Sequence, residues 1–171
     1  MKRWMLMAAL SLCACGRGQP PGAQLDYRPP DGSFAARVPG DWKVDESPGE
    51  TRKASFFGPS DGERPFSQSM GVYFHAAADP AAAARNYLAF QSSQGIAAPS
   101  PAKETDLEVI AERTLNDIHA GRQRLTTRTV VVIMPKGFFS LEHTWPAGTP
   151  PSPAFDELRR TFRGLTRPPQ S

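Results

Sequence analysis

The chain has 171 residues, with 20 Lys and Arg residues against 17 Asp and Glu residues and a formal net charge of +3. Lys2 and Arg3 belong to an N-terminal segment that we expect to be removed, and the remaining 18 basic and 17 acidic residues give a net charge of +1. A nearly neutral domain does not suggest a nucleic acid partner. Both cysteines, Cys13 and Cys15, lie near the N-terminus, which excludes disulfides, thiol catalysis and cysteine-ligated zinc from the folded part.

The N-terminus has the organisation of a secretory signal. Lys2 and Arg3 give it a positive start, an apolar run follows over residues 4–12, and the small residue Ala14 stands immediately before Cys15. This run is too short to cross a bilayer, because a membrane-spanning helix needs about 20 apolar residues. The pattern predicts an exported protein that is cut either before Cys15 or, as an ordinary signal peptide, within residues 16–22.

The segment Leu12-Cys13-Ala14-Cys15 resembles the lipobox of bacterial lipoproteins. The resemblance implies a signal peptide over residues 1–14 and a mature chain whose first residue, Cys15, carries acyl chains such as palmitate that hold the protein to a membrane. Cys13 fits lipidation less well, because it would follow the bulky Leu12. Gly16 stands where an aspartate would imply retention at the inner membrane, so the resemblance implies the outer membrane of a bacterial cell envelope, with the domain in the periplasm or at the surface.

Residues 15–30 are rich in Pro and Gly and contain little to bury, which predicts a flexible tether. We expect the folded domain over residues 31–167 and a short tail over residues 168–171. After a turn at Asp31-Gly32, apolar and polar residues alternate in the pattern of half-buried strands. The first four predicted strands cover residues 33–38, 42–45, 54–57 and 70–75.

A helix is predicted to begin at Asp79-Pro80, because Asp can cap free backbone N–H groups and Pro is favoured at the first helical position. Gly95 is its expected end. The side of this helix that we expect to face the core carries Ala84, Tyr87, Leu88 and Gln91.

The remaining elements are a strand over residues 107–112, a long strand pair over residues 122–134 and 138–145, and a closing helix. The long pair carries the strongest β signal and is expected in the middle of an antiparallel sheet. The closing helix is predicted to start at Ser152-Pro153, with a buried side formed by Phe155, Leu158, Phe162 and Leu165. This order predicts an α+β fold, with an antiparallel sheet of about six to seven strands and helices packed against it.

Three groups of residues resemble the PsbP-like domains, a fold also found in DcrB-type lipoproteins. They are Tyr27 with Asp31-Gly32-Ser33-Phe34 and Val38-Pro39-Gly40-Asp41-Trp42, the turn Ala120-Gly121-Arg122, and Phe155, Leu158 and Phe162 near the end. The resemblance implies an α/β/α sandwich and a domain that binds partners rather than catalysing a reaction. Fold alone is weak evidence for function, and none of the matched positions is a catalytic or ligand position of that family.

No phosphate-binding loop, nucleophile elbow or zinc-protease motif occurs in the sequence. The three histidines, His75, His119 and His143, have no metal-ligand spacing, although His75 and His143 could converge across a sheet. Ser140 and His143 would point to opposite faces of one strand, so they cannot form a catalytic pair. We therefore expect no metal, no cofactor and no catalytic residue.

A row of arginines, formed by Arg122, Arg124 and Arg128, is the clearest candidate binding surface. It would suit an anionic partner, or it could be paired internally with carboxylates such as Glu108 and Glu112. We expect a membrane-anchored, non-catalytic lipoprotein that binds another envelope component, either protein or glycan. The alternative is a carrier of a small apolar ligand in a cavity between sheet and helix, and a hydrolase ranks third.

Overall fold

The computed structural model describes residues 22–47, 49–60, 67–94, 96–98, 107–117 and 121–165. These residues form ten strands and two helices. The strands are β1 (Gln24–Tyr27), β2 (Phe34–Pro39), β3 (Lys43–Asp45), β4 (Arg52–Phe57), β5 (Ser69–Ala76), β6 (Ile96–Ala98), β7 (Leu107–Asp117), β8 (Gly121–Met134), β9 (Gly137–Pro146) and β10 (Arg163–Gly164). The helices are α1 (Pro80–Ser93) and α2 (Ala154–Thr161).

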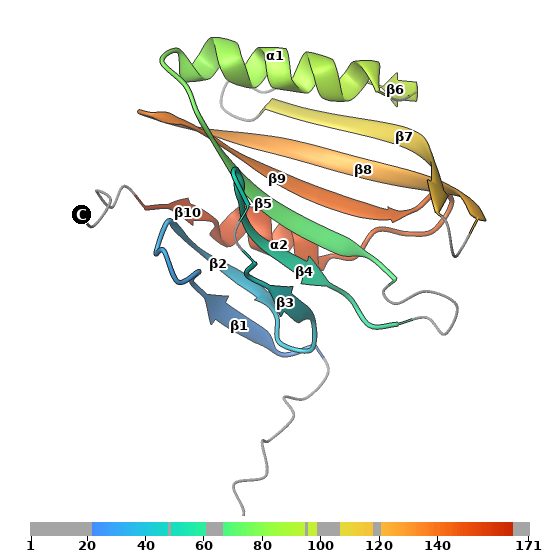
Figure 1. Cartoon of the computed structure of the whole chain (residues 1–171). Coiled ribbons are helices and arrows are strands. Elements are labelled where there is room, and N and C mark those ends of the chain that lie inside the picture. Colours follow the sequence, from blue (N-terminus) through green and yellow to red (C-terminus); the bar gives the residue numbers. More distant parts are fainter. Residues whose placement is uncertain are drawn as a thin grey trace, which may run out of the picture.

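Seven of the strands form one antiparallel sheet in the order β3-β4-β5-β9-β8-β7-β6, and β1, β2 and β10 form a small sheet beside it (Figure 1). The predicted α+β class is therefore confirmed. The long pair β8 and β9 lies inside the large sheet, as its sequence predicts, and is closed by a short turn before Gly137.

Helix α1 carries the chain from β5, across one face of the large sheet, to the far edge strand β6 (Figure 1). The Asp79 carboxylate accepts a hydrogen bond of 3.0 Å from the backbone N–H of Ala82, and Pro80 opens the helix, as expected. From β6 the strands return one by one until β9 pairs with β5. Because of this crossover, α1 packs mainly on β6, β7, β8 and β9.

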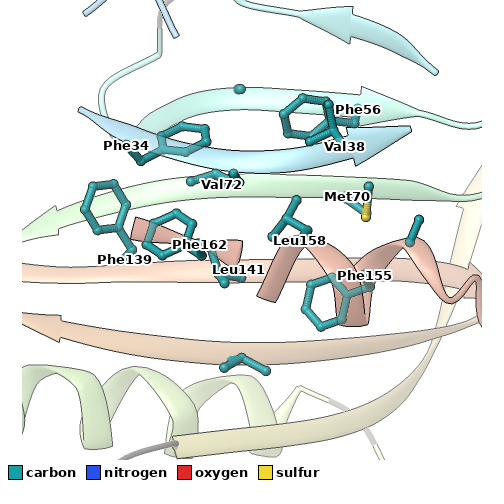
Figure 2. Packing of buried hydrophobic residues seen from close by; sticks show 14 residues of the cluster. Phe34, Val38, Phe56, Met70, Val72, Phe139, Leu141, Phe155, Leu158 and Phe162 are labelled. Carbon is teal, nitrogen blue, oxygen red and sulfur yellow. The ribbon is translucent and has the colours of Figure 1, made fainter. Parts of the chain in front are cut away.

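The larger core lies on the other face of the large sheet, beneath α2 and the small sheet (Figure 2). Phe34 and Val38 of β2, Leu141 of β9, and Phe155 and Leu158 of α2 are each at most 1% exposed there. A second cluster lies beneath α1, where Ala84 and Leu88 pack against Val109, Val131 and Phe138. Both faces of the sheet are thus covered by a helix, which gives the expected α/β/α arrangement.

Three short strands, β1, β6 and β10, were not predicted. Gln24–Tyr27 falls within the predicted tether over residues 15–30, so that prediction is wrong for these four residues, which pair with β2. They also place the Tyr27 ring 5.0 Å from the Phe56 ring, which ties the segment to the core. Ile96–Ala98 follows the predicted end of the first helix, where no strand was expected, but it pairs with β7.

The closing helix is shorter than predicted. It ends at Thr161, because Phe162 leaves the helical conformation with φ −57° and ψ 132°. Arg163 and Gly164 then pair with β2 as strand β10, and the N–H of Leu165 donates to the carbonyl of Ser33. Phe162 still enters the core, at 5% exposed, but from the end of the helix rather than from its face.

Several predicted features lie outside the described residues: the signal peptide with Cys13, the lipidation site Cys15, residues 16–21 of the tether, Gly95, His119 and the C-terminal tail. Neither of the two described helices is long and apolar enough to cross a membrane.

Candidate functional site

Polar side chains gather on the face of the large sheet that carries α1, at the side of the helix nearest β5. The alternation of β5 brings Tyr73 and His75 to this face, the alternation of β9 brings Ser140 and Glu142, and α1 contributes Tyr87. We call these five residues the tyrosine–carboxylate cluster. Ser140 is fully buried, and the other four are partly exposed.

Within the cluster, His75 and Ser140 are joined by a hydrogen bond of 3.1 Å between the His75 Nε2 and the Ser140 Oγ. The His75 ring is stacked on Phe138 at 4.6 Å and lies 4.7 Å from the Tyr87 ring. Burial lowers the pKa of His75, which favours the neutral imidazole. Because Ser140 is 0% exposed, its hydroxyl cannot reach a substrate carbonyl, and the pair links β5 to β9.

The Glu142 carboxylate accepts a hydrogen bond of 2.5 Å from the Tyr87 hydroxyl. Burial raises the pKa of Glu142, and this outweighs the opposing effects of that hydrogen bond and of the positive charge on Arg113. The pKa of Tyr87 is also raised, first by burial and then by the negative charge of Glu142. The carboxylate is therefore held in a poorly solvated position, and Tyr87 stays neutral beside it.

Tyr73 lies on the other side of Glu142. In the register of β5 and β9, Glu142 stands directly opposite Gly71, which has no side chain. The Tyr73 ring occupies the space above this glycine, because a Cβ on Gly71 would lie 2.5 Å from the Tyr73 Cε2. Burial and the charge of Glu142 raise the pKa of Tyr73. Glycine at position 71 thus allows an aromatic ring to lie beside the carboxylate.

Arg113 of β7 is close enough to Glu142 to affect its pKa, but its own hydrogen bonds go to α1. Its Nη2 donates to the side-chain oxygen of Gln91 and, at 3.2 Å, to the Gln91 carbonyl. Among the described residues, Glu142 forms no ion pair, and its one hydrogen-bond donor is Tyr87. The cluster therefore contains a partly buried carboxylate that the described part of the chain leaves without a cation in contact.

His143 lies on the opposite face of the sheet from His75 and Ser140. Its Nε2 donates to the Gln68 Oε1 at 2.8 Å, and the N–H of Ser152 donates to the same oxygen, also at 2.8 Å. Its ring lies 4.7 Å from Trp145 and is stacked at 5.2 Å on Phe155 of α2. Burial lowers the pKa of His143 to about 4, so this histidine is a neutral structural link between β9 and α2.

The two described members of the arginine row, Arg124 and Arg128, lie on this second face and are paired internally. Arg124 forms an ion pair of 2.7 Å with Glu112, and Arg128 forms ion pairs with Glu108 (2.7 Å) and Asp156 (2.8 Å). The predicted alternative of pairing with Glu108 and Glu112 is thus confirmed. Arg124 remains 69% exposed, whereas Arg128 is 20% exposed and lies over the Phe155 ring. The side chain of Arg122 lies outside the described part.

The expectation that Ser140 and His143 point to opposite faces is confirmed. The suggestion that His75 and His143 could converge is wrong, because they too lie on opposite faces. No group of three or more His, Cys, Asp or Glu residues that could hold a metal ion occurs among the described residues. The tyrosine–carboxylate cluster was not predicted, although the sequence contains one signal for it: Glu142 interrupts the otherwise neutral strand over residues 138–145.

Among solved structures, one from Bacteroides thetaiotaomicron has a similar fold, with a TM-score of 0.51 and 16% sequence identity. The match covers 86% of this chain and 50% of that chain, so this chain spans about half its length. At this identity the similarity concerns the fold alone. No family model and no curated protein matches the chain.

Proposed function

We propose that this protein is a bacterial lipoprotein of the cell envelope, anchored through lipidated Cys15, with a PsbP-like domain that has no catalytic role and binds another envelope component. The binding surface that the geometry favours is the sheet face beside α1. One observation carries this choice: the tyrosine–carboxylate cluster presents partly exposed aromatic rings and a carboxylate without an ion pair among the described residues. Exposed aromatic residues are enriched at protein interfaces.

Neither alternative has comparable support. A hydrolase would need an accessible nucleophile, and the hydroxyl nearest to a histidine, that of Ser140, is fully buried. A carrier would need a cavity between sheet and helix, and the described side chains of α1 pack directly against Val109, Val131 and Phe138. The arginine row remains a predicted surface for an anionic partner, with Arg124 as its most exposed described member.

Site-specific photo-cross-linking in cells that make the native protein tests the binding surface. A photoreactive residue at Phe90, which is 58% exposed one helical turn after Tyr87, should form a discrete adduct with one envelope component. The matched control is the same residue at Arg124, which is 69% exposed on the other face. Adducts from position 124 alone, or none from position 90, would refute the assignment of this face.

Fractionation with fatty-acid labelling tests the anchor. We expect Cys15→Ser to lose the label and to leave the membrane fraction or remain unprocessed, and Cys13→Ser to change neither. A label that is lost with Cys13→Ser and kept with Cys15→Ser would overturn the assignment.

A further inference from the structure

We infer that the tyrosine–carboxylate cluster is a receptor for one organic cation, the ammonium or guanidinium group of a lysine or arginine side chain in a protein partner. The inference rests on the proposed function, since it names the chemistry that the binding face recognises. Glu142 would pair with the cation, and the rings of Tyr73 and Tyr87 would flank it.

The Glu142 carboxylate is partly buried and lacks an ionic partner among the described residues. Buried charges in proteins are almost always paired with an opposite charge, because an unpaired ion loses its hydration without compensation. Glu142 has one hydrogen bond, from Tyr87, and no ion pair with a described residue. Arg113, whose positive charge acts on Glu142, is instead directed to Gln91 by two hydrogen bonds. A cation from outside would supply the missing partner.

Two tyrosines, Tyr73 and Tyr87, lie beside the Glu142 carboxylate. Cations are attracted to the faces of aromatic rings, and they form strong hydrogen bonds with carboxylates. The Tyr73 ring lies over Gly71, directly across the strand pair from Glu142, and the Tyr87 hydroxyl contacts the carboxylate from the helix side. A carboxylate between two tyrosines is suited to an alkylammonium or guanidinium group and disfavours an anion.

The position of the cluster indicates the source of the cation. The cluster is only partly exposed at the edge of α1, so its ligand must present the charge on a stem that reaches down to the sheet. Lysine and arginine side chains have such a stem. Phe90, at 58% exposed on the adjacent turn of α1, offers apolar contact for the residues around the inserted side chain. These features favour a polypeptide over a free small amine.

Chemical-shift titration of the purified full-length chain in detergent tests the inference. The probes are N-acetyl-arginine amide and N-acetyl-lysine amide, with the neutral N-acetyl-citrulline amide as control. We expect saturable shifts at Tyr73 and Tyr87 with the two cations and none with citrulline. Glu142→Gln should weaken binding by about tenfold to a hundredfold, the range for a lost hydrogen bond to a charged group. Glu112→Gln, on the other face, should leave it unchanged.

A second variant protects the test against a folding defect in Glu142→Gln. Tyr73→Leu keeps the carboxylate and removes one ring, and it should weaken binding by about two- to fivefold. Equal shifts with citrulline and arginine amides, or affinities unchanged in both variants, would overturn the inference. Saturable binding of phosphatidylethanolamine vesicles in preference to the amino acid amides would also overturn it, because the cation would then come from a lipid.

Failure of the cation site can be distinguished from failure of the proposed function. A partner adduct at position 90 that persists in Glu142→Gln would leave the binding face intact and refute the cation as its recognised group. Absence of any adduct, together with selective binding of the cationic amides, would instead refute the envelope partner and retain the cation site.

Discussion

Replacing His143 by Gln should change how the stability of this protein depends on pH. His143 is 1% exposed and lies between Trp145 and the Phe155 ring of α2. Burial, and to a smaller extent the charge of Arg128, lower the pKa of this histidine to about 4, although Asp156 opposes both. Gln at position 143 cannot titrate, although its amide can still donate a hydrogen bond to Gln68.

The direction of this pH dependence follows from the pKa of His143 in the folded and in the unfolded protein. Unfolding returns the pKa of His143 to its ordinary value of 6.5, so between pH 6.5 and about 4 the unfolded chain binds a proton that the folded chain does not. The contribution of His143 to the free energy of unfolding is therefore fully present above about pH 6.5 and is lost as the pH falls toward about 4. At about 1.4 kcal/mol for each pH unit in this window, the loss amounts to about 3 kcal/mol.

Urea unfolding of the parent protein and of His143→Gln, followed by tryptophan fluorescence between pH 4 and pH 8, measures this loss. Other groups titrate equally in both proteins, so the difference between the two free energies of unfolding isolates His143. At pH 8 the variant should be less stable, because it loses the ring contacts, and the gap should close by about 3 kcal/mol toward pH 4. A gap that stays constant to within about 0.5 kcal/mol across this range would refute the assignment of a buried neutral histidine.

Two further predictions concern packing and charge, and urea unfolding at neutral pH measures both. Phe162→Ala should lower the free energy of unfolding by about 3–5 kcal/mol, because this ring is 5% exposed. Trp42→Ala should lower it less, because Trp42 is only partly buried at the edge of the core. Equal losses in the two variants would contradict this. Arg128→Ala should cost about 1–3 kcal/mol, because it breaks ion pairs with both Glu108 and Asp156, while Arg124→Ala should cost no more than about 1 kcal/mol at its 69% exposed position. The reverse order would show that the arginine row does not hold α2 to the sheet.

The elements that depend on local interactions could be predicted from the sequence alone. Asp79 and Pro80 mark the start of α1, because a capping carboxylate and a residue without an N–H act within one helical turn. The alternation in β8 placed Arg124 and Arg128 on one face and Leu125 and Val131 on the other, since side chains in a strand have a period of two. The class of the fold followed from the order of these elements.

Three short strands form only because they pair with a longer strand, and the tertiary structure was needed to find them. Gln24–Tyr27, Ile96–Ala98 and Arg163–Gly164 are too short to show an alternating pattern, and each is held by a longer neighbour. The same holds for the end of α2, where the apolar spacing continues to Leu165 but the chain turns away after Thr161 to pair with β2. Local spacing cannot reveal a competing contact more than 100 residues away.

The candidate site was decided by register. The sequence predicted that Ser140 and His143 lie on opposite faces of β9, but which of them meets His75 depends on how β9 aligns with β5, 65 residues earlier. A slip of one residue would exchange the two faces and bring His143 to α1 in place of Glu142. That alignment is fixed by the burial of Phe139 and Leu141 beneath α2 and of Phe138 beneath α1, an energy that belongs to the assembled sheet and not to any one strand.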